Sequence, residues 1–298
     1  MDNVRGSILM VLAMLGFAVE DMLIKQMSAG LPVGQVVIVL GIGGACIFGV
    51  IAKVYGDTLW SEDAINPALW LRNACEIFGT LGFVSAIALT PISTASAILQ
   101  ATPLVVTMGA AFFLGETVGW RRWAAIIVGL FGVLLIIRPG MQGFDAKSLL
   151  AVMGVIGLAG RDLATRRIPK TISSRVIALN AFIASILTGF ILLKLGVTGS
   201  SWTTPDTTDT FRLVAAVFIG VAAYYAIVAA TRIGEMSIIA PFRYSRLVFA
   251  LIIGVMAFNE SPDALTLIGA LIIVISGIYT LWREAQLRRA SPSVTSTL

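Results

Sequence analysis

The chain has 298 residues, of which 58% are hydrophobic and 12% are charged, and its mean hydropathy is +0.95. A soluble domain carries about 25% charged residues, so this composition excludes a soluble globular protein and indicates an integral membrane protein. The absence of histidine excludes His-based metal sites, HExxH proteases and Ser-His catalytic triads.

The apolar residues fall into ten blocks, each long enough to cross a bilayer core at a rise of about 1.5 Å per residue. In chain order the predicted helices are 7–27, 32–52, 69–89, 92–114, 122–138, 148–167, 175–195, 211–231, 237–258 and 263–282. The gaps between them contain the chain-breaking residues Gly30, Pro32, Pro91, Gly140 and Pro262. The polar tail from Arg288 onward is predicted to be disordered.

The second half of the chain repeats the first. Glu116 and Glu260 are 144 positions apart, as are Ser93 and Ser237, while Asp21 and Asp162 are 141 apart, as are Lys25 and Arg166. The repeats are 1–140 and 141–287, each with five spans, followed by the tail 288–298. An odd number of spans makes the second repeat enter the membrane from the opposite side. The sequence therefore predicts two inverted five-helix repeats, an arrangement suited to alternating access.

The basic residues set the orientation. With the N-terminus inside, the cytoplasmic segments hold Arg5, Lys53, Arg121, Arg122, Arg166, Arg167, Lys170, Arg175, Arg232, Arg283, Arg288 and Arg289. The other side receives Lys25, Arg138, Lys147 and Lys194. This bias predicts that both termini are cytoplasmic. Because the basic residues lie between apolar blocks, the net charge of +5 does not indicate a nucleic-acid partner.

Charged residues inside the first span each need a partner or water. Asp21 and Lys25 lie one helical turn apart and are expected to pair. With Glu20 they would form a polar site in the outer vestibule that contacts a substrate amino group. The alternative is a snorkelling Lys25 with both carboxylates near the outer interface.

Three other spans carry charges that the topology places in the cytoplasmic half: Arg72, Glu76, Arg161, Asp162, Arg243 and Arg246. We expect Glu76 and Asp162 to pair with Arg243 or Arg246 and to hold the inner end closed while the outer end is open. The alternative is a static network at the helix ends.

Two prolines break predicted helices, and aromatic residues suggest a cavity. Pro103 leaves the carbonyl of Leu99 without its helical donor, and Pro241 breaks the ninth span nearer the cytoplasm. The predicted substrate cavity is lined by Phe17, Glu20, Asp21, Phe78, Phe83, Gln100, Tyr224, Tyr225 and Tyr244. The alternative for each aromatic residue is helix packing or lipid contact, and a kink used only for packing is the alternative for the prolines.

Several stretches of the chain resemble the EamA family of the drug/metabolite transporter superfamily. They are MLGFAVEDMLIK (14–25), TASAILQATPLVVTMGAAFFLGE (94–116), RRWAAIIVGLFGVLLIIRPG (121–140) and IAPFRYSRLVFALIIGVMAFNESPD (239–263). Within the family the chain resembles bacterial exporters of amino acids and related metabolites, including the YddG-type exporters. The resemblance implies ten helices in two inverted repeats, a central cavity and export across the inner membrane. Family members often carry an arginine in the second span, but VVIVLGIGG (36–44) has none.

The sequence thus predicts a secondary transporter with no cofactor and no metal, which exports small metabolites and, as the best candidates, aromatic and other apolar amino acids with broad specificity. Its partners would be the substrate and the lipid bilayer, and a monomer would contain a complete pathway. A carrier of nucleotide sugars, drugs or other anionic metabolites is the alternative, favoured by Arg161, Arg243 and Arg246. An intramembrane enzyme is not expected, because no nucleophile, base or metal motif is present.

Overall fold

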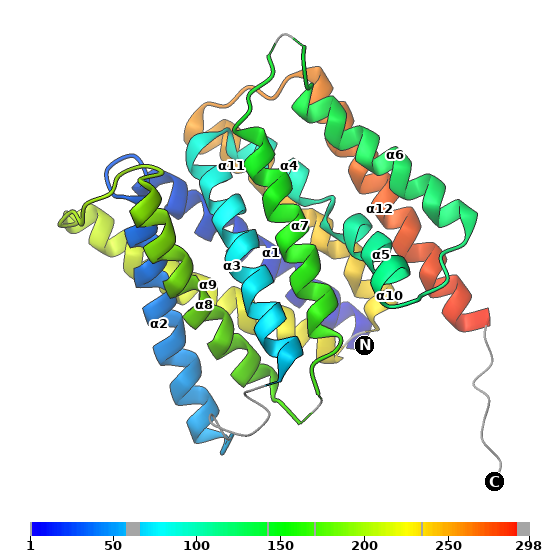
Figure 1. The fold of residues 1–298 in the computed structure, drawn as a ribbon, viewed down its shortest axis with the longest axis horizontal. Coiled ribbons are helices and arrows are strands. Elements are labelled where there is room, and N and C mark those ends of the chain that lie inside the picture. The colour runs from blue at the N-terminus through cyan, green and yellow to red at the C-terminus, as the bar shows by residue number, and fades with distance from the viewer. Residues whose placement is uncertain (1, 58–65, 142, 170, 234, 291–298) are drawn as a thin grey trace.

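The computed structural model describes residues 2–57, 66–141, 143–169, 171–233 and 235–290. All regular elements within these ranges are helical (Figure 1). In chain order they are α1 (Asp2–Met27), α2 (Val33–Val54), α3 (Pro67–Leu89), α4 (Ile92–Leu99), α5 (Thr102–Phe113), α6 (Trp120–Ile137), α7 (Ser148–Thr165), α8 (Ser174–Leu195), α9 (Thr207–Ile233), α10 (Met236–Ile239), the 3-10 helix η2 (Ala240–Tyr244), α11 (Ser245–Phe258) and α12 (Ala264–Ala290).

These helices form the ten membrane spans that the sequence predicts. The fourth span consists of α4 and α5, and the ninth consists of α10, η2 and α11. Nine spans in the described part of the chain are long and apolar enough to cross a bilayer by length and composition. The tenth is α3, whose first half carries Arg72, Asn73 and Glu76. The spans at both ends of the chain are longer than predicted, because α1 begins at Asp2 and α12 continues to Ala290. Positions 288–290 of the predicted tail are therefore helical, and 291–298 lie outside the described residues.

Local sequence signals account for several helix ends. The side chain of Asn66 accepts a hydrogen bond from the Ala68 amide at 2.9 Å and so caps α3. Ser173 caps α8 in the same way through the amide of Val176. At the other end of α8 the chain turns at Gly196, which adopts the left-handed conformation that glycine permits.

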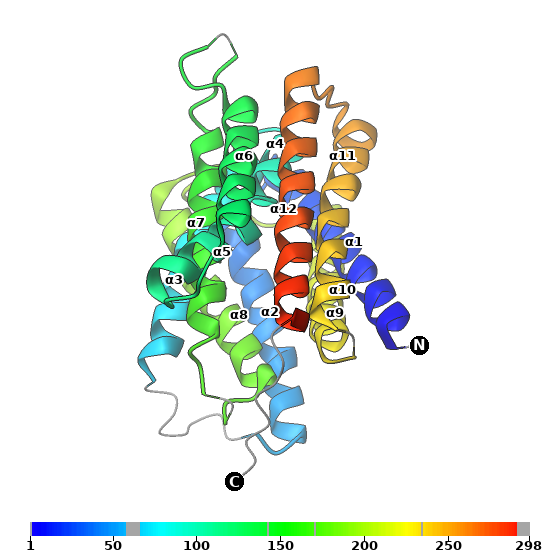
Figure 2. The same ribbon diagram turned by 90° about the vertical axis from the view of Figure 1, so that its right-hand side faces the viewer.

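The two halves of the chain pack mainly against each other. The most extensive helix contacts are α3 with α7, α2 with α8, α1 with α9, and α6 with α12. When each span is exchanged for its counterpart five spans along, the contact of α1 with α9 becomes that of α7 with α3. The pairs α2–α8 and α6–α12 map onto themselves; Figures 1 and 2 both show α6 beside α12. The contacts therefore follow a pseudo-two-fold symmetry, as expected for inverted repeats.

Small residues at the helix crossings obey the same symmetry. A Cβ atom added to Gly157 of α7 would lie 2.3 Å from the backbone nitrogen of Gly79 on α3. A Cβ atom added to Gly16 of α1 would lie 2.8 Å from the Cβ atom of Ala223 on α9. Gly16 and Gly157 are 141 positions apart, and Gly79 and Ala223 are 144 apart. At both of these equivalent crossings, glycine lets the two helix backbones approach each other closely.

The bundle has two distinguishable ends. Asp2 and the end of α12 lie at one end, which we call the terminal face (Figure 2). The other end, the opposite face, holds the connections from α6 to α7 and from α11 to α12 (Figure 1).

Candidate functional site

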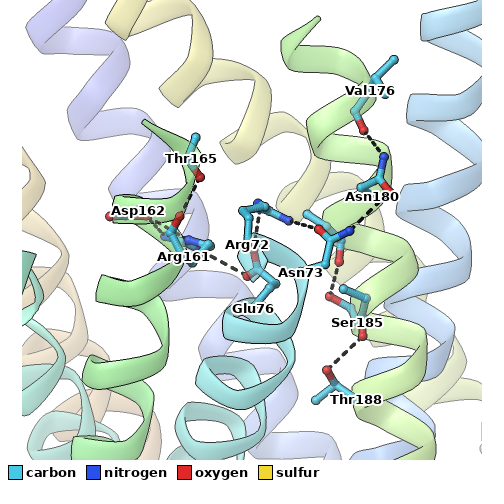
Figure 3. Close-up of polar contacts among 12 residues, drawn as sticks. Arg72, Asn73, Glu76, Arg161, Asp162, Thr165, Val176, Asn180, Ser185 and Thr188 are labelled. Carbon is cyan, nitrogen blue, oxygen red and sulfur yellow. Dashed lines mark hydrogen bonds and ion pairs between the residues drawn. The ribbon is translucent and has the colours of Figure 1, made fainter. Parts of the chain in front are cut away.

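Four charged side chains of α3 and α7 form a connected cluster (Figure 3). One carboxylate oxygen of Glu76 accepts a hydrogen bond from Arg72 Nη2 at 2.5 Å, and the other accepts one from Arg161 Nη1 at 3.2 Å. Arg161 also binds the neighbouring Asp162, with its Nη2 atom 2.8 Å from Oδ1. We call Arg72, Glu76, Arg161 and Asp162 the α3–α7 cluster. Two arginines thus face two carboxylates, so the charges balance within the bundle.

The α3–α7 cluster is sheltered on α3 and more open on α7. The side chains of Arg72 and Glu76 are 4% and 10% exposed, whereas those of Arg161 and Asp162 are 24% and 26% exposed. Figure 3 shows the polar chain continuing from Arg72 through Asn73 toward Asn180 of α8. The α7 side of the cluster is therefore its more exposed part.

A second charged pair joins α1 to α11. Arg246 donates from Nη2 and Nε to Asp21 Oδ2, at 2.6 and 3.2 Å. Its guanidinium lies 5.4 Å from the ring centre of Phe17 and 5.3 Å from that of Phe83. A guanidinium between two aromatic faces is stabilised by cation–π attraction. Asp21, Arg246 and the two rings therefore form a site that is charged in the middle and apolar on its flanks, which we call the Arg246 site.

Glu20, next to the Arg246 site, has no ion-pair partner among the described residues. Its carboxylate lies against Gly220 of α9, where an added Cβ atom would be 2.4 Å from Oε1. The repeat explains this position, because Glu20 corresponds to Arg161 and Gly220 corresponds to Glu76. The contact of α3 with α7 thus has an ion pair where the equivalent contact of α1 with α9 has a lone carboxylate beside a glycine.

Two pairings expected from the sequence are wrong. Asp21 binds Arg246 and not Lys25, whose amino group instead donates to backbone carbonyl oxygens at the C-terminal end of α3. Glu76 and Asp162 bind Arg161 and not Arg246 in this structure, and a gating role for these residues stays a prediction. Arg243 makes no hydrogen bond or ion pair with Asp162 in the described part of the chain.

The expected cavity aromatics separate into different environments. Phe17 and Phe83 lie at Arg246, as described. Tyr224 packs edge-on against Phe48 at 5.4 Å between ring centres and also contacts Phe182. This aromatic group joins α2, α8 and α9, and the Tyr224 hydroxyl is within electrostatic range of the α3–α7 cluster.

Three expected cavity residues lie elsewhere. Tyr225 is 66% exposed on the outer surface, because neighbouring residues of a helix point about 100° apart and its neighbour Tyr224 takes the inner position. Phe78 is 47% exposed and lines an apolar groove of about 510 Å³ formed mainly by α3, α5 and α7. Tyr244 is buried, with its hydroxyl packed over Gly277 of α12. A second apolar groove, of about 470 Å³, lies between α6 and α12.

The helix breaks lie where the prolines are. The fourth span is interrupted at Gln100 and Ala101, and Pro103 lies in the first turn of α5. The hydroxyl of Thr102 donates to the carbonyl oxygen of Leu99 at 2.6 Å and so replaces a helical donor. Gln100 is buried, and its Nε2 atom has no hydrogen-bond partner among the described residues. Pro241 lies in η2, which interrupts the ninth span.

Two carboxylates in the connections have lowered pKa values. Hydrogen bonds from Arg138 and Thr266 lower the pKa of Asp263 to about 2. Asp263 accepts from the backbone amide of Thr266 at 2.9 Å, as an N-cap of α12 does. A bidentate hydrogen bond from Arg175, at 2.6 and 2.9 Å, lowers the pKa of Asp57.

The most extensive polar contact that the sequence reading missed involves Glu260. Its carboxylate accepts hydrogen bonds from the amides of Ile92 and Ser93 and from the Ser93 hydroxyl. The repeat singled out Glu260 and Ser93 as counterparts of Glu116 and Ser237, and this recurrence was the available signal for a structural role.

The fold and these internal charges define a multi-pass membrane carrier. The model of the EamA-like transporter family matches residues 4–138 and 146–282, so the chain belongs to that family, whose members have two repeats of five helices. A crystal structure with 18% sequence identity covers 92% of this chain and 98% of its own, with a TM-score of 0.54, which shows the fold alone.

Relatives with named substrates are transporters of different metabolites. The S-adenosylmethionine uptake transporter of Rickettsia conorii is 28% identical over 72% of this chain and 71% of its own. The pseudopaline exporter CntI of Pseudomonas aeruginosa is 28% identical over 92% and 94%. The riboflavin transporter of Vibrio cholerae is 27% identical over 96% of both chains. The protein is therefore a metabolite transporter rather than an enzyme.

Proposed function

We propose that the protein is a secondary transporter of the inner membrane that exports amino acids, with preference for aromatic and other apolar ones. The observation that carries this proposal is the Arg246 site with the lone carboxylate of Glu20 beside it. An amino acid carries a carboxylate, an ammonium group and a side chain. Arg246 is placed to bind the carboxylate and Glu20 to bind the ammonium group. Phe17 and Phe83 are placed to contact an apolar side chain.

The Asp21–Arg246 contact supports binding by exchange of partners. A substrate carboxylate takes the place of Asp21 on the guanidinium of Arg246. Because Asp21 neutralises Arg246 when no substrate is bound, the empty site holds no unpaired positive charge. Few directed contacts imply broad specificity, because a site rejects strongly only analogues that leave its own polar groups unpaired. Phe17, Glu20, Asp21 and Phe83 are therefore the proposed substrate residues, together with Arg246.

The distribution of basic residues supports an orientation with both termini in the cytoplasm. Arg121, Arg166, Arg167 and Arg232 are exposed at or just beyond helix ends on the terminal face. Positively charged connections remain on the cytoplasmic side of a membrane. We also propose that a monomer is the working unit, because one chain supplies both inverted repeats and the Arg246 site.

The test is transport into liposomes that contain the purified protein. Labelled phenylalanine, threonine and a nucleotide sugar are compared, with and without a pH gradient. Uptake of the amino acids with mutual competition is expected, and the gradient decides whether a proton is coupled. Uptake of the nucleotide sugar alone would replace the amino-acid assignment by an anionic-metabolite carrier.

Substrate analogues assign the individual contacts. Phenethylamine lacks the carboxylate of phenylalanine, and 3-phenylpropionate lacks its amino group. Arg246→Gln should reduce the preference for phenylalanine over phenethylamine by about tenfold or more, the effect of one charge-assisted hydrogen bond. Glu20→Gln should do the same for the preference over 3-phenylpropionate.

Tyr225→Phe, at an exposed position, is the matched control and should change neither preference. Unchanged preferences in the Arg246 and Glu20 variants, with transport intact, would remove these residues from the substrate site.

A further inference from the structure

Glu260 binds the start of α4 at the opposite face. Ile92 N and Ser93 N donate to its two carboxylate oxygens at 2.6 and 3.0 Å, and Ser93 Oγ donates at 2.6 Å. The first amides of a helix have no partner inside the helix, and the helix dipole favours a negative charge there. One carboxylate after α11 thus holds the α3–α4 connection against the end of the ninth span.

Lys25 binds the other end of the same connection. Its Nζ atom donates to the carbonyl oxygens of Ile87 at 3.0 Å and Thr90 at 2.5 Å, and lies 3.9 Å from Glu260 Oε1. The carbonyls at a helix C-terminus attract a cation as its N-terminal amides attract an anion. Lys25 and Glu260, which we call the first lock, therefore tie the ends of α1, α3 and α11 to the start of α4.

The inverted repeat supplies a counterpart on the terminal face. Lys25 corresponds to Arg166, 141 positions later, and Glu260 corresponds to Glu116, 144 positions earlier. In the structure Arg166 Nη1 lies 2.9 Å from Glu116 Oε1. We call Arg166 and Glu116 the second lock. The same charge pair thus occurs at both faces, although the four residues come from four different spans or connections.

The two locks differ in their surroundings. The side chains of Lys25 and Glu260 are 16% and 10% exposed, whereas those of Arg166 and Glu116 are 40% and 38% exposed. Ile87, which accepts from Lys25, is fully buried, but its counterpart Thr231 at the end of α9 is exposed. The first lock is therefore packed among other side chains at the opposite face, while the second lock is exposed at the terminal face.

We propose that the two faces close alternately during transport, each held by its own lock, and that in this structure the first lock is sheltered while the second, although its ion pair is formed, is exposed. When the opposite face opens, Glu260 leaves α4, and Arg166 with Glu116 becomes sheltered against the end of α9 as Lys25 now is against α3. Inverted repeats require this exchange, since each half adopts in one state the conformation that the other half has in the other state. The proposal rests on the transporter class and not on an amino-acid substrate.

A cysteine behind the first lock reports its opening. Ser96 is buried on α4 one turn after Ser93, on the same helix face. We would introduce Ser96→Cys into a chain whose two cysteines, Cys46 and Cys75, are replaced by serine. The protein is placed in lipid nanodiscs, and the rate of reaction with a bulky, charged maleimide is measured. Nanodiscs expose both faces, so the result does not depend on orientation.

Matched variants of the two locks should shift the labelling rate in opposite directions. Glu260→Gln weakens the first lock and should raise the rate by about tenfold or more, as expected for loss of one hydrogen bond to a charged group. Glu116→Gln weakens the second lock, which holds the terminal face closed in the other state, and should lower the rate. Lys25→Gln should act like Glu260→Gln and provides a second variant of the first lock if Glu260→Gln does not fold.

Non-specific destabilisation would raise labelling in both variants. Equal changes of the same sign, or no change in folded Glu260→Gln and Lys25→Gln, would overturn the two-lock proposal. The labelling requires no substrate, so a failure of amino-acid uptake in the liposome experiment would leave this result unaffected.

Discussion

Glu76→Gln should be among the most destabilising single amide substitutions in this protein. The carboxylate of Glu76 binds Arg72 through one oxygen and Arg161 through the other, and its side chain is only 10% exposed. Glutamine has nearly the same shape, but its amide nitrogen would face one of the two guanidinium groups. The substitution therefore removes an acceptor from Arg72 or Arg161 and leaves the α3–α7 cluster with one positive charge in excess.

The magnitude follows from burial. Removing one partner of a buried ion pair costs about 3–5 kcal/mol, because the remaining charge is left uncompensated. Glu116→Gln makes the same chemical change in a pair whose side chains are 38–40% exposed. Exposed pairs contribute roughly 0–1 kcal/mol. The expected difference between the variants is thus about 3 kcal/mol, or roughly 100-fold in the unfolding equilibrium.

Equilibrium unfolding in mixed micelles, followed by circular dichroism while the denaturing detergent is increased, measures this difference. Salt adds a second readout, since added salt screens the exposed pair far more than the buried one. If Glu76→Gln and Glu116→Gln unfold within about 1 kcal/mol of each other, the α3–α7 cluster is solvated and the argument from burial fails.

Two further predictions concern helix packing and pH. Gly157→Ala should destabilise by about 1–3 kcal/mol, because the new methyl group meets the backbone of Gly79 at 2.3 Å. Gly49→Ala, whose nearest contact is at 3.8 Å, is the control, and equal unfolding of both variants would contradict the close crossing. The pKa of Asp263 is lowered from 3.8 to about 2, so its small contribution to stability is present above about pH 4 and is lost as the pH falls toward 2. The difference in melting temperature between the wild type and Asp263→Asn should disappear over that interval, and a constant difference would refute the assignment.

Much of the fold could be predicted because the bilayer fixes the length of each span. The breaks at Pro91 and Pro262 and the repeat of Glu116 at Glu260 were enough to place ten helices in two related halves. The terminal helices were predicted too short, since α1 begins at Asp2 and α12 continues to Ala290. Hydropathy detects only the part of a helix that lies in the hydrocarbon core. Polar residues can extend the same helix beyond the membrane, and hydropathy does not reveal that extension.

The charged residues of the site could be selected from the sequence, but their partners could not. Arg72 and Glu76 lie one helical turn apart and form an ion pair. Asp21 and Lys25 have the same spacing, but Asp21 binds Arg246, 225 positions away. The sequence grouped Arg246 with Glu76 and Asp162, whereas in the structure it binds Asp21 of α1. Contacts between helices far apart in the chain depend on packing, which helical spacing does not predict.

The packing of each repeat against the other governs how the protein is made. Helices α1, α2 and α3 find their main partners in α9, α8 and α7, which the ribosome produces later. Asp21 must wait for Arg246, 225 residues downstream, which at 5–20 residues per second is roughly 10–45 s of synthesis. During that time a buried carboxylate has no partner and the glycine crossings are open to lipid. The first half is therefore inserted before the helices that complete its packing have been made.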